Sequence, residues 1–549
     1  MPKTVSTTKR GQDVLLDAFL NKGTAFTAEE RQQLHLDGLM PPAVSSEEDQ
    51  IKRASAAVKH LEDDLDRYVA LLALQDRNIH LFYNVLMHNM SDMMPIVYTP
   101  TVGLACQQYS KVFQRANGLW INPTMQGRIQ QVLADAVGEQ DIELIVVTDN
   151  ESILGIGDQG AGGMAISVGK LALYVAGAGI HPQKTLPISL DVGTNNQSLI
   201  DDPLYLGYRH PRLTGAAYDD FVEEFVSAVQ VVCPNTLLQW EDFRKDNALN
   251  LLNRYKDRCL SFNDDIQGTG AVAMAGLFSA LRITESNITD HRILIHGAGA
   301  AGMGIADQAQ AALVGEGLDP QAAQQQIAVL DSRGLLVDDV EIRDAYKAKM
   351  AWPAAFAESL GLTQDARHLH DVVAAFKPTI IIGSSGQARA FDQALVDTMS
   401  SYCERPIIMP FSNPTALAEA LPSDLLQWTD GRALVATGSP FEPVQLNGKT
   451  HRIGQGNNVF IFPGLGLGAL VAETTTVTDA MVTAASRACA EAVSDAELAE
   501  GMLYPDIARL REVSIQVAAA VAQAAGKDIS TDDIAKRMWS PEYPAITAV

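Results

Sequence analysis

The chain has 549 residues, which is too long for a single hydrophobic core and predicts two to four domains. Hydrophobic residues make up 47% of it and charged residues 19%, a balance typical of a folded globular enzyme. The formal net charge of -25 argues against nucleic acid and anionic lipid as partners, because both require a basic surface. We therefore expect no nucleic acid partner and no membrane partner.

The cysteines and the N-terminal sequence indicate where in the cell the protein is expected to function. The five cysteines are scattered and show no CxxC pair, as expected for reduced thiols of a cytosolic protein. The apolar run after Arg10 is short and interrupted by Asp17, so it does not fit a signal peptide. The longest apolar stretch, which follows Gly270, is too short to span a bilayer. A cytoplasmic location is the expectation.

The first hundred residues have a helical pattern. A plausible cap at Ser45 or Ser46 precedes apolar residues in steps of three and four, namely Ile51, Ala54, Val58, Leu61, Leu65, Tyr68 and Leu72. A later helix is predicted to break at Pro95, with residues 96–98 extended and Tyr98 held before Pro100. The pattern is equally compatible with packing inside the domain and with a subunit interface.

From Ile142 strands and helices alternate, which predicts an α/β architecture. The strand IELIVVTD is followed by the glycine-rich GIGDQGAGG, the helix MAISVGKLALYVAG and the strand LPISLDV. Lys170 lies on that helix among apolar neighbours. The pattern alone predicts that it faces solvent, because helical lysines usually extend their amine to water.

Two short apolar strands each end in adjacent acids, Glu241-Asp242 after NTLLQW and Asp264-Asp265 after RCLSFN. The segment between them carries apolar residues at helical spacing, which predicts a strand, a crossover helix and a parallel strand. Both acidic pairs then lie at the carboxyl edge of one sheet, where ligands usually bind. Oxygen ligands suit Mg²⁺ or Mn²⁺, although each pair taken alone could also serve as a helix cap or a solvated strand end.

A second α/β unit begins near His291. RILIHGAGAAGMG places Gly297, Gly299 and Gly302 between a strand and a helix, the context in which GxGxxG indicates a dinucleotide site. QIAVLD ends at Asp331, where an acid would bind ribose. Its charge favours NAD, while Arg333 leaves NADP open as the less favoured cofactor. Strands at KPTIIIG, RPIIMPF and RALVATG complete the predicted sheet, and Asn457 and Asn458 in a later turn can donate to a carboxylate.

Nine segments, taken in order, resemble the malic enzyme family: VYTPTVG, ILGIGDQG, SVGKLALY, WEDF, FNDDIQGTG, GAGAAG, FSNPT, ATGSPF and GQGNNVFIFPG. The resemblance spans nearly the whole chain from about Leu15. It implies an α/β fold in three parts: a helical N-terminal region at 1–115, a metal and substrate domain at 116–263 with 458–549, and an inserted Rossmann-like domain at 264–457. It implies a homodimer or homotetramer.

The resemblance also implies an activity, the oxidative decarboxylation of L-malate to pyruvate and CO₂ with NAD and Mg²⁺ or Mn²⁺. Tyr98 matches the family's general acid and Lys170 its general base, which reverses the expectation that this lysine faces solvent. Asp264 matches the acid that interacts with the lysine. Glu241, Asp242 and Asp265 match the family's metal ligands, and Asp265 also matches a residue beside the cofactor. Asn413 and Asn457 match the amides that contact substrate and nicotinamide.

One position departs from the family pattern. The run TDNESILG has Ser152 where the family has an arginine that pairs with a substrate carboxylate, so at most a neutral hydrogen bond replaces a bidentate ion pair. The related malolactic enzymes, which convert malate to lactate and CO₂ with retained NAD, also lack that arginine and provide the alternative function. Two further readings are a catalytically dead dinucleotide sensor and a surface on which the acids only confer solubility.

Overall fold

The computed structural model describes residues 4–549 and divides the chain into two compact units. The first unit runs to Val232 and includes Lys536–Val549, and the second is Cys233–Ala535. The α/β class predicted from the sequence is confirmed, because each unit combines parallel strands with helices. The domain boundaries implied by the resemblance stay a prediction.

The N-terminal part of the first unit includes helices α3 (Glu47–His60), α4 (Asp64–Arg77) and α5 (Ile79–His88). Ser46, not Ser45, caps α3, and its side chain accepts a hydrogen bond from the Asp49 N–H. The apolar stripe that starts at Ile51 continues across two helices, because Asp63 accepts bonds from the first N–H groups of α4 and begins a new helix there. The predicted helical region is therefore present, divided near Leu61.

The prediction of an extended segment after Pro95 is wrong. Helix α6 (Met90–Val97) contains Pro95, and Tyr98 is the residue that ends it. A proline inside a helix removes one backbone hydrogen bond. Burial of Met93, Met94 and the residues that follow outweighs that loss, so the helix continues to Val97.

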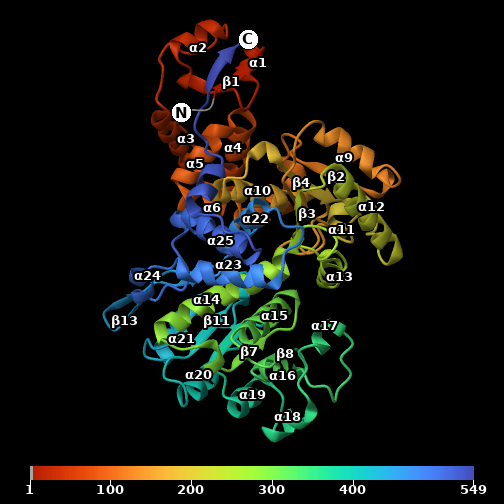
Figure 1. Ribbon diagram of the computed structural model, residues 1–549, viewed down its shortest axis with the longest axis vertical. Helices are drawn as coiled ribbons and strands as arrows, with labels where there is room; N and C mark the ends of the chain where they lie inside the picture. The colour runs from red at the N-terminus through yellow and green to blue at the C-terminus, as the bar shows by residue number, and fades with distance from the viewer. Residues whose placement is uncertain (1–3) are drawn as a thin grey trace. The chain divides into compact units, whose positions relative to one another are not determined.

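Parallel strands form the α/β part of the first unit. Strand β4 (Thr185–Leu190) pairs with β2 (Leu119–Ile121) on one side and with β3 (Leu144–Thr148) on the other. Helix α10 (Met164–Ala178) packs on β3 and β4 and is buried along almost its whole length, and α9 (Ile129–Val137) packs on α12 (Ala216–Val232). The end of the chain belongs to the same unit: β16 (Ala545–Ala548) pairs in parallel with β1 (Thr4–Thr7) (Figure 1).

The second unit contains the predicted strand, helix and parallel strand. Strand β5 (Leu237–Trp240) is followed by α13 (Lys245–Tyr255) and by β6 (Ser261–Asn263), which pairs with β5 in parallel. Both acidic pairs begin directly after these strands, as the sequence predicted.

A sheet of seven strands in the order β15-β12-β11-β10-β7-β8-β9 forms the rest of the second unit. All its pairings are parallel except that of β9 with β8. Helices α15 (Ala300–Gly315) and α16 (Pro320–Gln325) lie beside β7 and β8 (Figure 1). The strands are β7 (Ile293–His296), β8 (Ile327–Asp331), β9 (Gly334–Leu335), β10 (Ile380–Gly383), β11 (Ile407–Pro410), β12 (Leu434–Thr437) and β15 (Gly454–Gln455).

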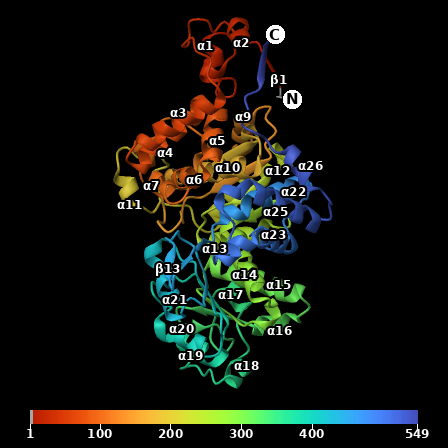
Figure 2. The same ribbon diagram turned by 90° about the vertical axis from the view of Figure 1, so that its left-hand side faces the viewer.

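Long apolar helices fill the rest of the second unit. Helices α14 (Thr269–Thr284), α22 (Phe462–Val471), α23 (Asp479–Glu491) and α25 (Leu510–Ala524) pack on one another, and Figure 2 shows α22, α23 and α25 together. Gly464 and Gly468 face Val517 and Val521, so the two backbones approach closely. The helical run from Asp264 to Thr284 is longer than the apolar stretch read from the sequence and long enough to cross a membrane, as is Gly160–Ala178, but 83% and 94% of these windows are buried inside the protein.

Candidate active site

The first acidic pair follows a fully buried strand. Glu241 and Asp242 are 2% and 5% exposed, although carboxylates are seldom buried without partners. Asp242 has a φ of 56°, a left-handed conformation that non-glycine residues adopt mainly at turns and functional sites. The strand therefore ends in a sharp turn that places both acids at its carboxyl end.

The second acidic pair opens a single turn of π-helix, η5 (Asp264–Gly268), which continues into α14. Asn263 caps the turn by accepting a hydrogen bond of 2.9 Å from the Ile266 N–H. Turns of π-helix are rare and frequently occur at functional sites. The two adjacent acids of this turn, Asp264 and Asp265, accept hydrogen bonds from different partners.

Glu241, Asp242 and Asp265 converge. One carboxylate oxygen from each lies within 4.8 Å of the others. Asp265 Oδ2 accepts a 2.8 Å bond from the Asp242 N–H, and Glu241 Oε2 accepts one of 2.8 Å from Gln239 Nε2. Converging oxygens of like charge suit a hard divalent cation, so these residues fit the metal that the resemblance implies. Gln239, which sequence reasoning missed, orients one of the ligands.

Asp264 is not part of this cluster. It is fully buried, and Asn458 Nδ2 donates to its Oδ2 at 3.0 Å and to its carbonyl oxygen at 3.2 Å. The sequence suggested that the amides at 457 and 458 donate to a carboxylate. For Asn458 that acceptor is the protein's own Asp264, whereas Asn457 Oδ1 accepts from the Val459 N–H at 3.0 Å.

Tyr98 and Lys170 lie together in the first unit. Lys170 is 1% exposed, so the solvent-facing expectation from its helical pattern is wrong. Its Nζ lies 5.1 Å from the centroid of the Tyr98 ring. A Cβ on Gly169 would lie 2.7 Å from the Val97 carbonyl oxygen, so this glycine allows α10 to approach the end of α6. Burial of a lysine favours its neutral form, which is the form that accepts a proton.

The glycine turn has the geometry of a dinucleotide site. Gly297 has a φ of 126° and follows β7 directly, and Gly299 is the N-cap residue of α15, with open space where a Cβ would lie. A pyrophosphate at the start of α15 would meet free backbone N–H groups and the positive end of the helix dipole. Gly302 faces the Gly297 carbonyl, so a side chain there would block the turn.

Asp331 ends β8, the position of a ribose-binding acid. Lys347 Nζ lies 2.9 Å from its Oδ2, and the Arg333 N–H donates to its Oδ1 at 2.8 Å. Partial burial opposes ionisation, but these donors and charges prevail and hold the pKa of Asp331 below its ordinary value. The acid is therefore ionised and already paired with Lys347, a partner that the sequence did not indicate.

Asn413 and Asn457, the two amides that the resemblance assigns to substrate and nicotinamide, follow strands of the seven-stranded sheet. Asn413 comes after β11, is exposed, and accepts a hydrogen bond from Ser439 Oγ through its side-chain oxygen. This hydrogen bond fixes the orientation of the Asn413 side-chain amide. Asn413 and Asn457, the predicted substrate contacts, thus lie in the unit that also holds the acidic cluster and the glycine turn.

Ser152 lies in the loop after β3 and follows Glu151, which forms an ion pair with Arg212, an arginine that sequence reasoning missed. The Arg212 side chain is 2% exposed and has ion pairs to Asp149, Glu151 and Asp158 at 3.4, 3.6 and 3.3 Å. Burial would lower its pKa, but these carboxylates raise it above the ordinary value. Arg212 is therefore bound to the protein's own acids and shapes the loop that carries Ser152.

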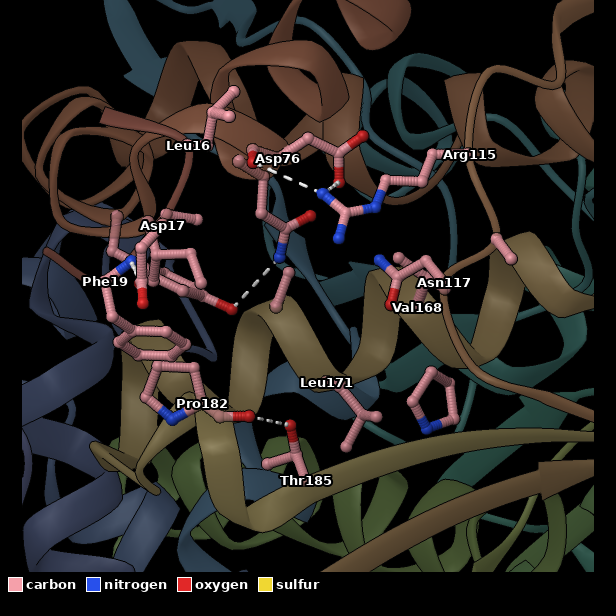
Figure 3. Close-up of a pocket in the computed structure, with 17 residues that line it drawn as sticks. Leu16, Asp17, Phe19, Asp76, Arg115, Asn117, Val168, Leu171, Pro182 and Thr185 are labelled. Atoms are coloured by element: carbon pink, nitrogen blue, oxygen red, sulfur yellow. Dashed lines mark hydrogen bonds and ion pairs between the residues drawn. The ribbon is translucent and has the colours of Figure 1, made fainter. Parts of the chain in front are cut away.

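The opposite face of α10 borders a pocket of about 400 Å³ (Figure 3). Val168 and Leu171 line it together with Phe19, and an ion pair of 4.0 Å joins Arg115 to Asp76 at its rim. None of the predicted site residues is among those that line it. The pocket is separate from the candidate site.

A doubly wound sheet with a glycine turn and converging carboxylates defines a dinucleotide-dependent oxidoreductase. Residues 75–256 match the family model of the malic enzyme N-terminal domain, and residues 266–526 match that of the malic enzyme NAD-binding domain. The chain belongs to the malic enzyme family.

Named relatives support this assignment, and solved structures share the fold. The chain is 45% identical over 550 residues to "NAD-dependent malic enzyme 2" of Photobacterium profundum, covering 98% of both chains. It is 45% identical over 556 residues to "NAD-dependent malic enzyme 3" of Bacillus subtilis, covering 99% of this chain and 98% of that protein. The fold is similar to the crystal structure of Entamoeba histolytica malic enzyme, with a TM-score of 0.56 at 21% identity over 92% of this chain and 90% of that one. It is also similar to the NAD-dependent malic enzyme of Thermotoga maritima, with a TM-score of 0.51 at 21% identity over 78% and 92%.

Proposed function

We propose that this protein oxidises and decarboxylates L-malate to pyruvate and CO₂, with NAD as the hydride acceptor. The observation that carries the proposal is the cluster of Glu241, Asp242 and Asp265 in the same unit as the glycine turn of Gly297. The names of the relatives, NAD-dependent malic enzymes that match this chain nearly end to end, support it.

The chemistry assigns separate tasks to the residues. Glu241, Asp242 and Asp265 would hold Mg²⁺ or Mn²⁺, which when bound would polarise the oxygens of the substrate. Lys170, which is buried, would accept the proton of the C2 hydroxyl as hydride leaves C2 for the nicotinamide ring. Tyr98 would donate a proton to C3 after CO₂ has left. Asn413 and Asn457 would orient substrate and nicotinamide.

Three finer statements belong to the same proposal. The oxygen-only ligand set favours Mg²⁺ or Mn²⁺ over softer ions. All five cysteines are free thiols, which suits a reducing, cytoplasmic location. A homodimer or homotetramer is proposed from the family resemblance.

The test is product analysis of the purified protein with L-malate, NAD and Mn²⁺. We expect NADH and pyruvate to accumulate in equal amounts. Lactate and CO₂ formed in equal amounts without net NADH would instead establish the malolactic reaction. Lys170→Ala should abolish turnover. That loss would exclude the alternative of a catalytically dead dinucleotide sensor. Lys184→Ala, which removes a lysine whose side chain is 36% exposed in the same unit, is the matched control and should leave turnover unchanged.

A further inference from the structure

Glu419 is a fully buried carboxylate in the second unit. Its Oε1 accepts hydrogen bonds of 2.8 Å from both the N–H and the hydroxyl of Ser385, and one from the Ser412 hydroxyl. The Ser412 N–H approaches its other oxygen at 3.4 Å. A buried carboxylate is costly unless donors surround it, and here all the surrounding groups donate.

These donors belong to two loops at the carboxyl edge of the sheet. Ser385 follows β10 and Ser412 follows β11, and the two strands pair with Gly383 opposite Pro410. A Cβ on Gly383 would collide with the Glu419 carboxyl group, so the strand end is shaped to admit that side chain. The Gly386 N–H donates to Ser412 Oγ at 2.8 Å, which closes the link between the loops.

The linked loops border the glycine turn and Asn413. Ser384 Oγ donates to the Gly297 carbonyl oxygen at 3.2 Å, and Asn413 is the residue after Ser412. In a doubly wound sheet one half binds the adenosine part of a dinucleotide and the other half binds the nicotinamide part. Asp331 marks the first half at β8, so β10 and β11 belong to the nicotinamide half.

We propose that Glu419 is a positioning residue of the cofactor site, which holds the Ser384–Gly386 loop and the Ser412–Asn413 turn in the shape that receives the nicotinamide half of NAD. The inference rests on the proposed function for the identity of the cofactor. Glu419 acts through these loops, since its carboxylate is enclosed by their serines. Neither the glycine pattern nor the acidic pairs indicated this residue.

The experiment measures NADH binding directly, by fluorescence titration of the full-length protein, together with KM for NAD and Kd for Mn²⁺. Glu419→Gln replaces one acceptor oxygen by a donor that faces the Ser412 N–H. We expect Kd for NADH and KM for NAD to rise roughly tenfold, because buried donors lose their acceptor. Kd for Mn²⁺ should stay unchanged, because the ligands of the acidic cluster lie on other elements.

Two comparisons make the result specific. Glu404→Gln removes the same charge from an exposed position before β11 and should change none of these values. Ser412→Ala removes the hydroxyl that joins Glu419 to Gly386, should weaken NADH binding by itself, and should combine with Glu419→Gln less than multiplicatively. Ser412→Ala also provides the test if the Glu419 variant does not fold.

The proposal is overturned if NADH binds the variants as tightly as the wild type. It is also overturned if NADH and Mn²⁺ affinity fall together with the melting temperature, since that would indicate a purely structural role. NADH binding that depends on Glu419 in a protein that does not turn over malate would refute the proposed function and leave this inference standing.

Discussion

Each carboxylate of the acidic cluster is oriented by its backbone conformation or by a hydrogen bond. Asp242 is turned by its own left-handed backbone, and its N–H holds Asp265. Gln239, two residues before Glu241, holds that carboxylate through a hydrogen bond. Strained backbone and supporting hydrogen bonds are typical of sites held in shape before a ligand binds, so this geometry favours the hypothesis that the cluster binds a cation.

We expect Ser152 to weaken the binding of malate, because it lacks the charge of the arginine in the family pattern. Replacing Ser152 by Arg would supply the guanidinium that the family pattern has there, and a charged bidentate hydrogen bond is stronger than a neutral one. We expect Ser152→Arg to lower KM for malate by roughly tenfold, with KM for NAD unchanged. Steady-state kinetics with each substrate varied in turn measure this. An unchanged KM for malate would show that the loop held by Arg212 does not face the substrate carboxylate.

We expect Asp331 to influence the choice between NAD and NADP. Its charge repels a 2′-phosphate, while Lys347 lies 2.9 Å from it and would remain to bind one. Asp331→Asn should therefore raise the ratio of kcat/KM for NADP to that for NAD by roughly tenfold. Initial rates with both cofactors test this, with the exposed Asp365→Asn as the control of equal charge. A ratio unchanged in Asp331→Asn would place the discrimination elsewhere.

At the scale of elements, the contacts that position the site depend on glycines where helices meet. A Cβ on Gly304 of α15 would collide with the Ile266 carbonyl of η5, and one on Gly270 would lie 2.5 Å from the Gly304 carbonyl. The turn that carries Asp265 therefore packs directly against the dinucleotide-binding helix. This contact connects the turn of Asp265, a candidate metal ligand, with the helix of the glycine turn inside one unit.

Gly304→Ala tests that connection. The added methyl group must displace η5, so we expect the free energy of unfolding to fall by about 1–3 kcal/mol and the Kd for Mn²⁺ to rise. Denaturant unfolding and calorimetric titration measure the two effects. Gly315→Ala lies on the same helix with open space around it and should be neutral or slightly stabilising. Equal behaviour of the two variants would contradict the packing argument.

Local patterns were sufficient to predict the strands and the acidic pairs. The apolar runs of β5 and β7 are followed at once by Glu241 and Gly297, so the strand ends and these candidate site residues could be predicted together. Features fixed by distant contacts were not readable. The burial of Lys170 depends on packing around α10, and the role of Glu419 depends on serines seven and 34 positions away. At Pro95 the local signal was misleading: proline disfavours a helix interior, but packing of the surrounding residues keeps this segment helical.

At the scale of the whole molecule, the net charge of -25 means that the folded state carries considerable self-repulsion. The converging carboxylates of Glu241, Asp242 and Asp265 concentrate part of that charge in a largely buried place. A divalent cation that binds the folded chain there must stabilise it, because the unfolded chain does not bring these acids together.

We expect Mn²⁺ at about 100 times its Kd to stabilise the protein by about 2.7 kcal/mol. Thermal unfolding measures this, and hydrogen exchange should locate the added protection around Glu241 and Asp265 in the second unit. Asp265→Ala should abolish both effects, whereas Asp246→Ala, which removes an exposed acid of α13, should leave them intact. NaCl at matched ionic strength separates specific binding from screening of the surface charge. Equal stabilisation by NaCl, or retained stabilisation in Asp265→Ala, would mean that the acids do not form a metal site.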